Sequence, residues 1–148
     1  MPAATDLPRP DDAVGRVWLV GAGPGDPELI TLKAVRVLAQ ADVVLIDDLA
    51  NAALVCHARP NARVIRVGKR GGCRSTPQAF IIRLMLREAR RGRCVVRLKG
   101  GDPAVFGRSA EELDACRRAG IACEIVPGIT AASAASAALG APLTDRAH

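Results

Sequence analysis

Short apolar runs alternate with longer amphipathic stretches along the chain from Gly15 onward. The apolar runs have the length of buried strands, and the amphipathic stretches repeat their apolar residues at helical spacing. The predicted strands are 16–20, 43–46, 64–67, 94–98 and 122–126. The predicted helices are 28–41, 51–58, 76–91, 109–119 and 130–139. This alternation predicts an α/β fold with a five-stranded, mostly parallel sheet and helices on both of its faces.

Capping signals accompany these helices. Asp26 before Pro27 predicts an N-cap with proline at the first helical position, and Thr76 and Thr130 predict two further caps. Glu112 falls in a first turn, where the helix dipole favours acidic residues. The apolar positions at helical spacing in the first helix are Leu29, Leu32, Val35 or Arg36, and Ala39.

Ligands of parallel α/β sheets bind beyond the carboxyl ends of the strands, so the loops that follow the strands are the candidate site. These loops are 21–27, 47–49, 68–74, 100–107 and 127–130. The first, GAGPGDP, departs from the dinucleotide fingerprint because Asp26 stands where its third glycine belongs. It is either a plain tight turn or a stretch of backbone that a ligand approaches closely. In the fourth loop, Asp102 offers a carboxylate that can accept hydrogen bonds from amino or hydroxyl groups.

Composition narrows the function classes. The chain has 148 residues, a net charge of +6, two Phe, one Trp and no Tyr. The positive charge suits an anionic ligand, but the scarcity of aromatic residues argues against binding of single-stranded nucleic acid. Five cysteines without C-x-x-C spacing, and only two histidines, predict reduced thiols in a cytoplasmic protein and no metal site. No apolar run is long enough to cross a membrane, so no membrane partner is expected. The scarcity of aromatic residues is the reason that no nucleic-acid partner is expected.

Three divisions of the chain are predicted. Residues 1–15 are rich in proline and polar groups, which predicts a disordered segment without a signal peptide. Residues 16–140 form the α/β domain, and residues 141–148 begin a linker.

Five segments of the chain together resemble the tetrapyrrole methylases, specifically the uroporphyrinogen-III C-methyltransferases. They are GAGPGDPELITLKA, ADVVLIDDL, VGKRGG, VVRLKGGDPAVFGR and VPGITAA, and they occur in this order. The resemblance covers nearly everything from Gly15 to Arg146. It implies the first, S-adenosylmethionine-binding domain of an enzyme that methylates C2 and C7 of uroporphyrinogen III to give precorrin-2, for sirohaem or cobalamin. It also implies a homodimer.

The resemblance assigns roles to individual residues. Asp47 matches the family's proton acceptor and Lys69 its proton donor. The positions that match cofactor-binding residues are Pro24, Gly100, Gly101, Asp102, Val105, Thr130 and Ala131. Arg70 and Arg74 are basic side chains suited to the substrate's carboxylates, although Arg74 fits a solvated rim equally well.

The chain departs from the family pattern at several places. The family usually has Arg where this chain has Asp48, which removes one expected contact to a substrate carboxylate. Ala104 stands for a usual Phe and Ser109 for a usual Gly. The family pattern also continues into a second α/β domain that closes the cleft, whereas this sequence ends at His148. The chain is therefore expected to be a half-enzyme.

Three alternatives stay open at this stage. One is a methylase of a later corrin intermediate, against which the Lys69 loop argues. Another is an inactive fragment that serves only for dimerisation or binding. A nucleic-acid-binding module is supported by the net charge alone.

A first prediction concerns cofactor affinity. Without a second wall to exclude water, the 148-residue chain alone should bind S-adenosylmethionine weakly or not at all. Isothermal titration calorimetry tests this, and a nanomolar dissociation constant would contradict it.

Overall fold

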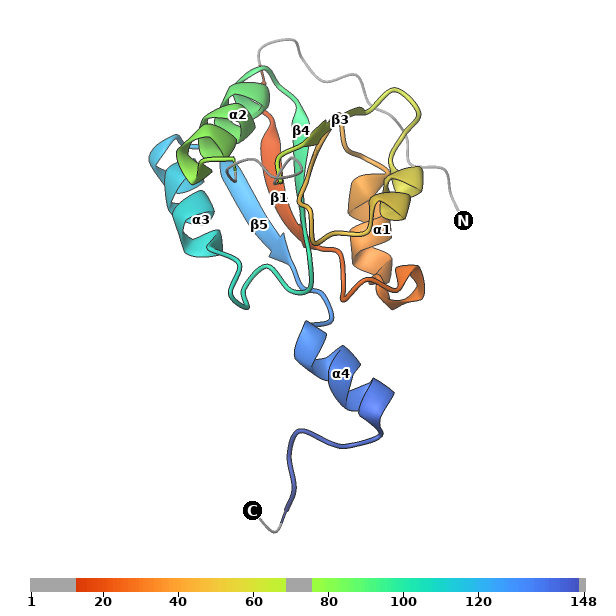
Figure 1. The fold of residues 1–148 in the computed structure, drawn as a ribbon. Coiled ribbons are helices and arrows are strands. Elements are labelled where there is room, and N and C mark those ends of the chain that lie inside the picture. The colour runs from red at the N-terminus through yellow and green to blue at the C-terminus, as the bar shows by residue number, and fades with distance from the viewer. Residues whose placement is uncertain (1–12, 69–75, 147–148) are drawn as a thin grey trace.

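Five parallel strands in the order β3-β2-β4-β1-β5 form the central sheet of the computed structural model, which describes residues 13–68 and 76–146 (Figure 1). The strands are β1 (Arg16–Gly21), β2 (Val43–Ile46), β3 (Arg63–Arg66), β4 (Cys94–Lys99) and β5 (Ala122–Val126). The α-helices are α1 (Leu32–Leu38), α2 (Gln78–Arg90), α3 (Ser109–Arg118) and α4 (Ala131–Leu139). Two 3-10 helices are η1 (Pro27–Leu29) and η2 (Ala52–His57). The predicted α/β class and the five-stranded parallel sheet are confirmed.

The strand order places a crevice between β1 and β4. From β1 the chain crosses to β2 on one side, whereas from β4 it crosses to β5 on the other. Adjacent strands whose connections leave in opposite directions leave a gap at their carboxyl ends, where parallel sheets bind ligands. The loops after β1 and β4 border this gap.

Two aliphatic cores lie on the two faces of the sheet. On one face Val20, Val96 and Leu98 pack with Leu38 of α1 and Leu54 of η2. The other core lies under α2 and α3 and contains Leu19, Leu45, Val95, Met85 and Cys116. Helices therefore cover both faces, as predicted, and Figure 1 shows α1 opposite α2 and α3.

The predicted helix 28–41 is interrupted. Asp26 caps as predicted, since its side chain accepts a hydrogen bond from the Glu28 N–H, but only the short η1 follows. Thr31 is extended and caps a new helix by accepting from the Ala34 N–H. This second start resets the helical phase, so that the buried face contains Ala34, Val37 and Leu38. The predicted face was wrong at Leu32, whose exposed fraction is 88%, and at Ala39, which is also exposed.

The start of α2 also differs from the prediction. Thr76 does not cap it, because α2 begins only at Gln78, with Pro77 at the N-cap position and no side-chain cap; the Thr76 hydroxyl donates to the Gly68 carbonyl. The remaining differences are shifts of one or two residues at element ends, with Asn51 capping η2 and Thr130 capping α4.

The two ends of the described chain differ in their contacts. The Gly15 N–H donates to the Ala89 carbonyl, which attaches the start of β1 to the end of α2. The rest of the predicted N-terminal segment, residues 1–12, lies outside the described residues. At the other end, α4 has no buried residue among those described and extends away from the sheet (Figure 1).

Within the described ranges, no helix has both the length and the apolarity needed to cross a membrane.

A buried carboxylate stabilises the end of α2. The Glu88 side chain is fully buried and is bound by the guanidinium groups of Arg87, Arg91 and Arg93. Burial alone would raise the pKa of Glu88, but hydrogen bonds from Arg87 and Arg93 and their positive charges outweigh it. The net pKa lies below the ordinary value of 4.5, so the folded state favours the ionised form.

Glu88→Gln should lower the free energy of unfolding by about 1–3 kcal/mol at neutral pH, because charge-assisted hydrogen bonds are lost. A lowered folded-state pKa stabilises the fold above the unfolded pKa, and this contribution disappears as the pH falls through the folded pKa. Urea unfolding from pH 7 to pH 3 measures the difference between the two proteins, which should shrink below about pH 4.5.

Glu124→Gln is the control, because it breaks the half-exposed surface pair of Glu124 with Arg16 and should cost at most about 1 kcal/mol. Equal stability of Glu88→Gln and the unsubstituted chain at pH 7 would contradict the role given to Glu88.

Candidate functional site

Glycines bring the loops after β1, β4 and β5 into backbone contact. Gly23 and Gly101 form an antiparallel bridge, in which the Gly101 N–H donates to the Gly23 carbonyl at 2.7 Å. A Cβ atom on Gly21 would lie 2.6 Å from Gly128 Cα, and one on Gly128 would lie 2.3 Å from the Gly101 oxygen. Any side chain at Gly21 or Gly128 would push these loops apart. Because the loops touch through glycines, the surface that they present at the carboxyl ends of β1 and β4 consists of backbone atoms.

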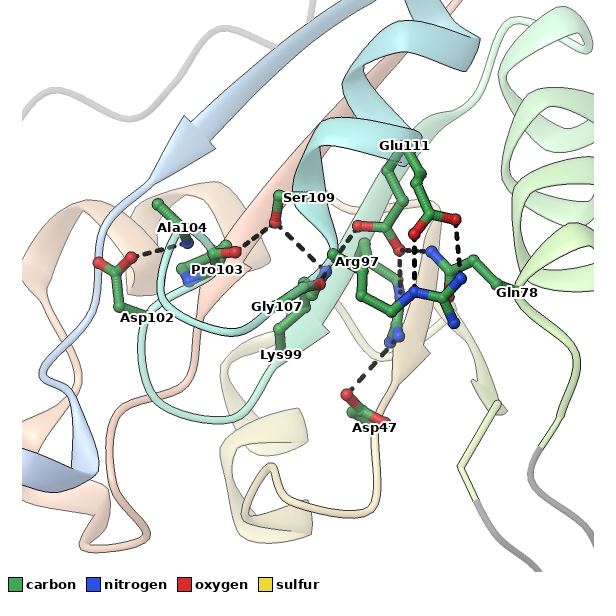
Figure 2. A network of polar contacts seen from close by, with 12 residues as sticks. Asp47, Gln78, Arg97, Lys99, Asp102, Pro103, Ala104, Gly107, Ser109 and Glu111 are labelled. Atoms are coloured by element: carbon green, nitrogen blue, oxygen red, sulfur yellow. Dashed lines mark hydrogen bonds and ion pairs between the residues drawn. The ribbon is translucent and has the colours of Figure 1, made fainter.

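Asp102 joins two of these loops. Its Oδ1 accepts from the Ala104 N–H at 2.8 Å, and its Oδ2 accepts from the Gly128 N–H at 2.9 Å (Figure 2 shows the first contact). Both oxygens are thus used by backbone, and Asp102 is not among the residues that line the cavity described next. In the described structure its carboxylate acts as a tie between the loops after β4 and β5.

A cavity of about 800 Å³ occupies the predicted crevice. Loops after all five strands contribute to it, together with residues of β4, α2 and α4. The cofactor positions implied by the family resemblance that line it are Pro24, Gly100, Gly101, Val105, Thr130 and Ala131. The structure therefore brings together residues that are more than 100 positions apart in the sequence.

Asp47 lies on the charged side of this cavity, directly after β2. Its Oδ2 is 3.6 Å from Arg97 Nη2, and its Oδ1 accepts from the Asp48 N–H at 3.2 Å. These contacts hold the carboxylate between a cation and the backbone while 30% of the side chain stays accessible. Asp48 also lines the cavity, and its carboxylate lies where a Cβ atom on Gly68 would be.

Three predicted residues of the site fall outside the described residues. They are Lys69, the expected proton donor, and the two basic residues Arg70 and Arg74. The preceding Gly68 and the following Thr76 both line the cavity.

Two buried cations, Arg97 and Lys99, line the cavity, and Figure 2 shows the polar contacts around them. Arg97 and Lys99 point to the same face of β4, and each is less than 5% exposed. The fully buried Glu112 of α3 accepts from Arg97 Nε at 3.2 Å, from Lys99 Nζ at 2.7 Å and from Gln78 Nε2 at 3.3 Å. The helix dipole was the predicted reason for an acid at position 112, but the structure gives Glu112 a different main role, the neutralisation of two buried cations.

Lys99 and Arg97 differ in how their N–H groups are used. The three donors of the Lys99 ammonium are matched by Glu112, by the Ser109 hydroxyl and by the Gly107 carbonyl. Arg97 uses Nε and Nη2, but its Nη1 has no acceptor among the described residues although it is buried. A buried donor without a partner costs about 1–3 kcal/mol, and such donors are rare in protein cores, so Nη1 calls for a partner such as a water, an ion or a ligand.

The loop between β4 and α3 has an unusual backbone at the cavity. Phe106 and Arg108 both have left-handed φ values, +52° and +53°, which side chains with a Cβ adopt rarely. Arg108 forms a two-point pair with Glu111, and the Phe106 ring is fully exposed beside the opening.

Sequence reasoning missed Arg97, Lys99 and Glu112 as a unit. A signal was present, because two cations alternate with apolar residues in a strand that has to be buried on both faces. Such cations require a buried anion, but the sequence did not show which element supplies it. The described residues hold no group of three or more His, Cys, Asp or Glu side chains suited to a metal ion.

Comparison with known proteins gives a consistent result. A family model described as Tetrapyrrole (Corrin/Porphyrin) Methylases matches residues 16–148. A uroporphyrinogen-III C-methyltransferase of Pseudomonas aeruginosa is 67% identical over 132 residues, which are 89% of this chain and 54% of that protein. Siroheme synthase 1 of Aeromonas hydrophila is 51% identical over 142 residues, which are 96% of this chain and 31% of that protein.

A solved structure agrees with these sequence relatives. The uroporphyrin-III C-methyltransferase of Thermus thermophilus complexed with S-adenosylhomocysteine has a TM-score of 0.73 and 51% identity. The match covers 89% of this chain and 54% of that one. This chain thus spans about half the length of the P. aeruginosa and T. thermophilus proteins, and less of the siroheme synthase.

Asp102→Asn should weaken the tie between the two loops, because the amide nitrogen cannot accept a hydrogen bond and leaves the Ala104 or Gly128 N–H unmatched. The free energy of unfolding should fall by about 1–3 kcal/mol in urea titrations. Amide hydrogen exchange at Gly128 should become roughly tenfold faster or more.

Asp26→Asn is the matched control, since one side-chain oxygen suffices to cap η1 and asparagine keeps it. Unchanged exchange at both Ala104 and Gly128 in Asp102→Asn would contradict the role of Asp102 as a tie.

Proposed function

The chain belongs to the tetrapyrrole (corrin/porphyrin) methylases, and from this we propose that it forms the S-adenosylmethionine-binding half of a uroporphyrinogen-III C-methyltransferase. The reaction is methylation of C2 and C7 of uroporphyrinogen III to precorrin-2, a precursor of sirohaem and cobalamin. The observation that carries the proposal is the cavity in which bare loop backbone meets the charged wall of Asp47 and Arg97.

The backbone part of the cavity fits S-adenosylmethionine. Gly100 and Gly101 have no side chains to fill the crevice, and Gly101 adopts a φ of +65° that favours glycine. Pro24 and Val105 add apolar surface, while Thr130 and Ala131 lie at the start of α4. In this proposal Asp102 shapes the cofactor site through the loops that it joins.

The bound S-adenosylmethionine supplies an electrophilic methyl group. C2 and C7 are β-carbons of their pyrrole rings, and electron donation from the ring nitrogen makes them carbon nucleophiles, so the protein has mainly to hold each in line with that methyl group. As the new carbon–carbon bond forms, positive charge develops on the ring, and S-adenosylhomocysteine departs. Asp47 stabilises this charge and then accepts the proton that the cationic ring loses from its N–H or from the adjacent methylene bridge, with the orientation of Asp47 set by Arg97 and the Asp48 N–H.

Residues outside the described ranges complete the proposal. Lys69 acts as the proton donor, and Arg70 and Arg74 bind substrate carboxylates.

We further propose a homodimer, to which the exposed α4 contributes. A cytoplasmic location agrees with the interpretation of the cysteines as reduced thiols.

The test is methyl transfer from labelled S-adenosylmethionine to uroporphyrinogen III. The chain spans about half of its P. aeruginosa relative, so it is assayed alone and with the remaining half of that relative as a separate polypeptide. Label in the tetrapyrrole is expected in the mixture. Asp47→Asn should lower the rate by about 10²–10⁴-fold, because an amide can neither accept the proton nor balance the charge.

Asp114→Asn, on the outer surface of α3, is the control and should leave the rate unchanged. A folded chain that transfers no label in either assay, or Asp47→Asn with full activity, would contradict the proposal.

A further inference from the structure

Arg97 differs from the other described cations that line the cavity. Lys99 has an acceptor for each of its ammonium hydrogens, and Arg108 is bound at two points by Glu111. Arg97 is 3% exposed and lines the cavity, and its Nη1 has no acceptor among the described residues. It is therefore the buried cation of this wall that has N–H groups to offer to a ligand.

The orientation of the Arg97 guanidinium is fixed before any ligand arrives. Glu112 holds Nε at 3.2 Å, and Asp47 lies 3.6 Å from Nη2. Because the guanidinium is planar, these contacts also determine the direction of the Nη1 hydrogens. A group held in this way loses little conformational freedom on binding, which favours affinity.

The charges around Arg97 indicate what it binds. Two neutral acceptors would satisfy the hydrogen-bonding capacity of Nη1, but a carboxylate also forms the stronger, charge-assisted hydrogen bond. Glu112 is shared with Lys99, and Asp47 is the second carboxylate beside these two cations, so what remains open at Arg97 is the hydrogen-bonding capacity of Nη1. A further anion at Nη1 would complete the coordination of a cation that is screened from water.

We propose that Arg97 is a ligand-binding residue of this cavity and that its Nη1 binds a carboxylate of the tetrapyrrole substrate. This assignment rests on the proposed function. The carboxylate of the methionine end of S-adenosylmethionine has the same chemistry. We assign the contact to the tetrapyrrole because Arg97 lies beside Asp47, whereas the cofactor positions lie on the glycine loops.

Direct binding to the chain mixed with the remaining half of its P. aeruginosa relative separates the two carboxylate sources. Uroporphyrin III, which has the eight carboxylates of the substrate but does not react, is titrated by fluorescence, and S-adenosylhomocysteine is titrated by calorimetry. Arg97→Gln should weaken uroporphyrin binding roughly tenfold or more, because both the charge and the Nη1 donors are lost. S-adenosylhomocysteine affinity should stay within about twofold, since its proposed contacts are elsewhere.

Arg97→Gln removes one of the two cations that neutralise the buried Glu112, and a loss of stability would by itself lower ligand binding. A second comparison therefore separates loss of stability from loss of the contact. The double variant Arg97→Gln/Glu112→Gln removes one charge of each sign and is compared with Glu112→Gln alone. It should show the same roughly tenfold loss for uroporphyrin III. Arg117→Gln, at an exposed Arg–Asp pair on α3, is the matched control and should bind both ligands normally.

Each outcome decides the proposal. Loss of uroporphyrin affinity alone supports it, whereas loss of S-adenosylhomocysteine affinity alone reassigns the carboxylate to the cofactor and overturns the substrate contact. Unchanged affinities in both Arg97 variants overturn it while the proposed function stands. If the unsubstituted mixture of the two halves binds neither ligand, the Arg97 contact is overturned too, and the methyl-transfer assay then decides separately on the proposed function.

Discussion

The buried carboxylate of Glu112 is the interaction on which the site depends most. It stands between Arg97 and Lys99, two cations that β4 carries on a face covered by α2 and α3. Neither cation can be removed from water without a nearby anion, because the desolvation of an unpaired charge costs several kcal/mol. Glu112 thereby determines where α3 packs, and through Gln78 it also contacts α2.

The same interaction positions the loop that borders the cavity. Lys99, held by Glu112, donates to the Gly107 carbonyl and to Ser109, whose hydroxyl in turn donates to the Pro103 carbonyl. These contacts fix the loop from its inner side, while Asp102 fixes it from the side of β5. The family resemblance implies glycine where this chain has Ser109, so the hydroxyl that joins Lys99 to Pro103 is a feature of this sequence.

The cavity combines two kinds of wall, and each is formed by a different constraint. The glycine wall depends on close backbone contact, since a Cβ on Gly21 or Gly128 would separate loops that now touch. The charged wall depends on compensation of buried charge, which leaves Asp47 and one side of Arg97 facing the cavity. A ligand with an apolar or neutral part and a carboxylate part suits this combination, as the proposed pair of S-adenosylmethionine and a tetrapyrrole would.

The sequence by itself determined the α/β class, the parallel sheet and the loops that form the site. These follow from local patterns: apolar runs of strand length, helical periodicity, and the rule that ligands bind beyond the carboxyl ends of parallel strands. The short-range signal at Asp26 was sufficient for its cap, but Thr76 and Leu32 show its limit. Thr76 does not cap because α2 begins two residues later, at Gln78, and a second cap at Thr31 rotates the helix face. Only the tertiary structure decided that Glu112 meets Arg97 and Lys99 and that Asp102 bonds to Gly128, because these partners lie on different elements and nothing local selects them.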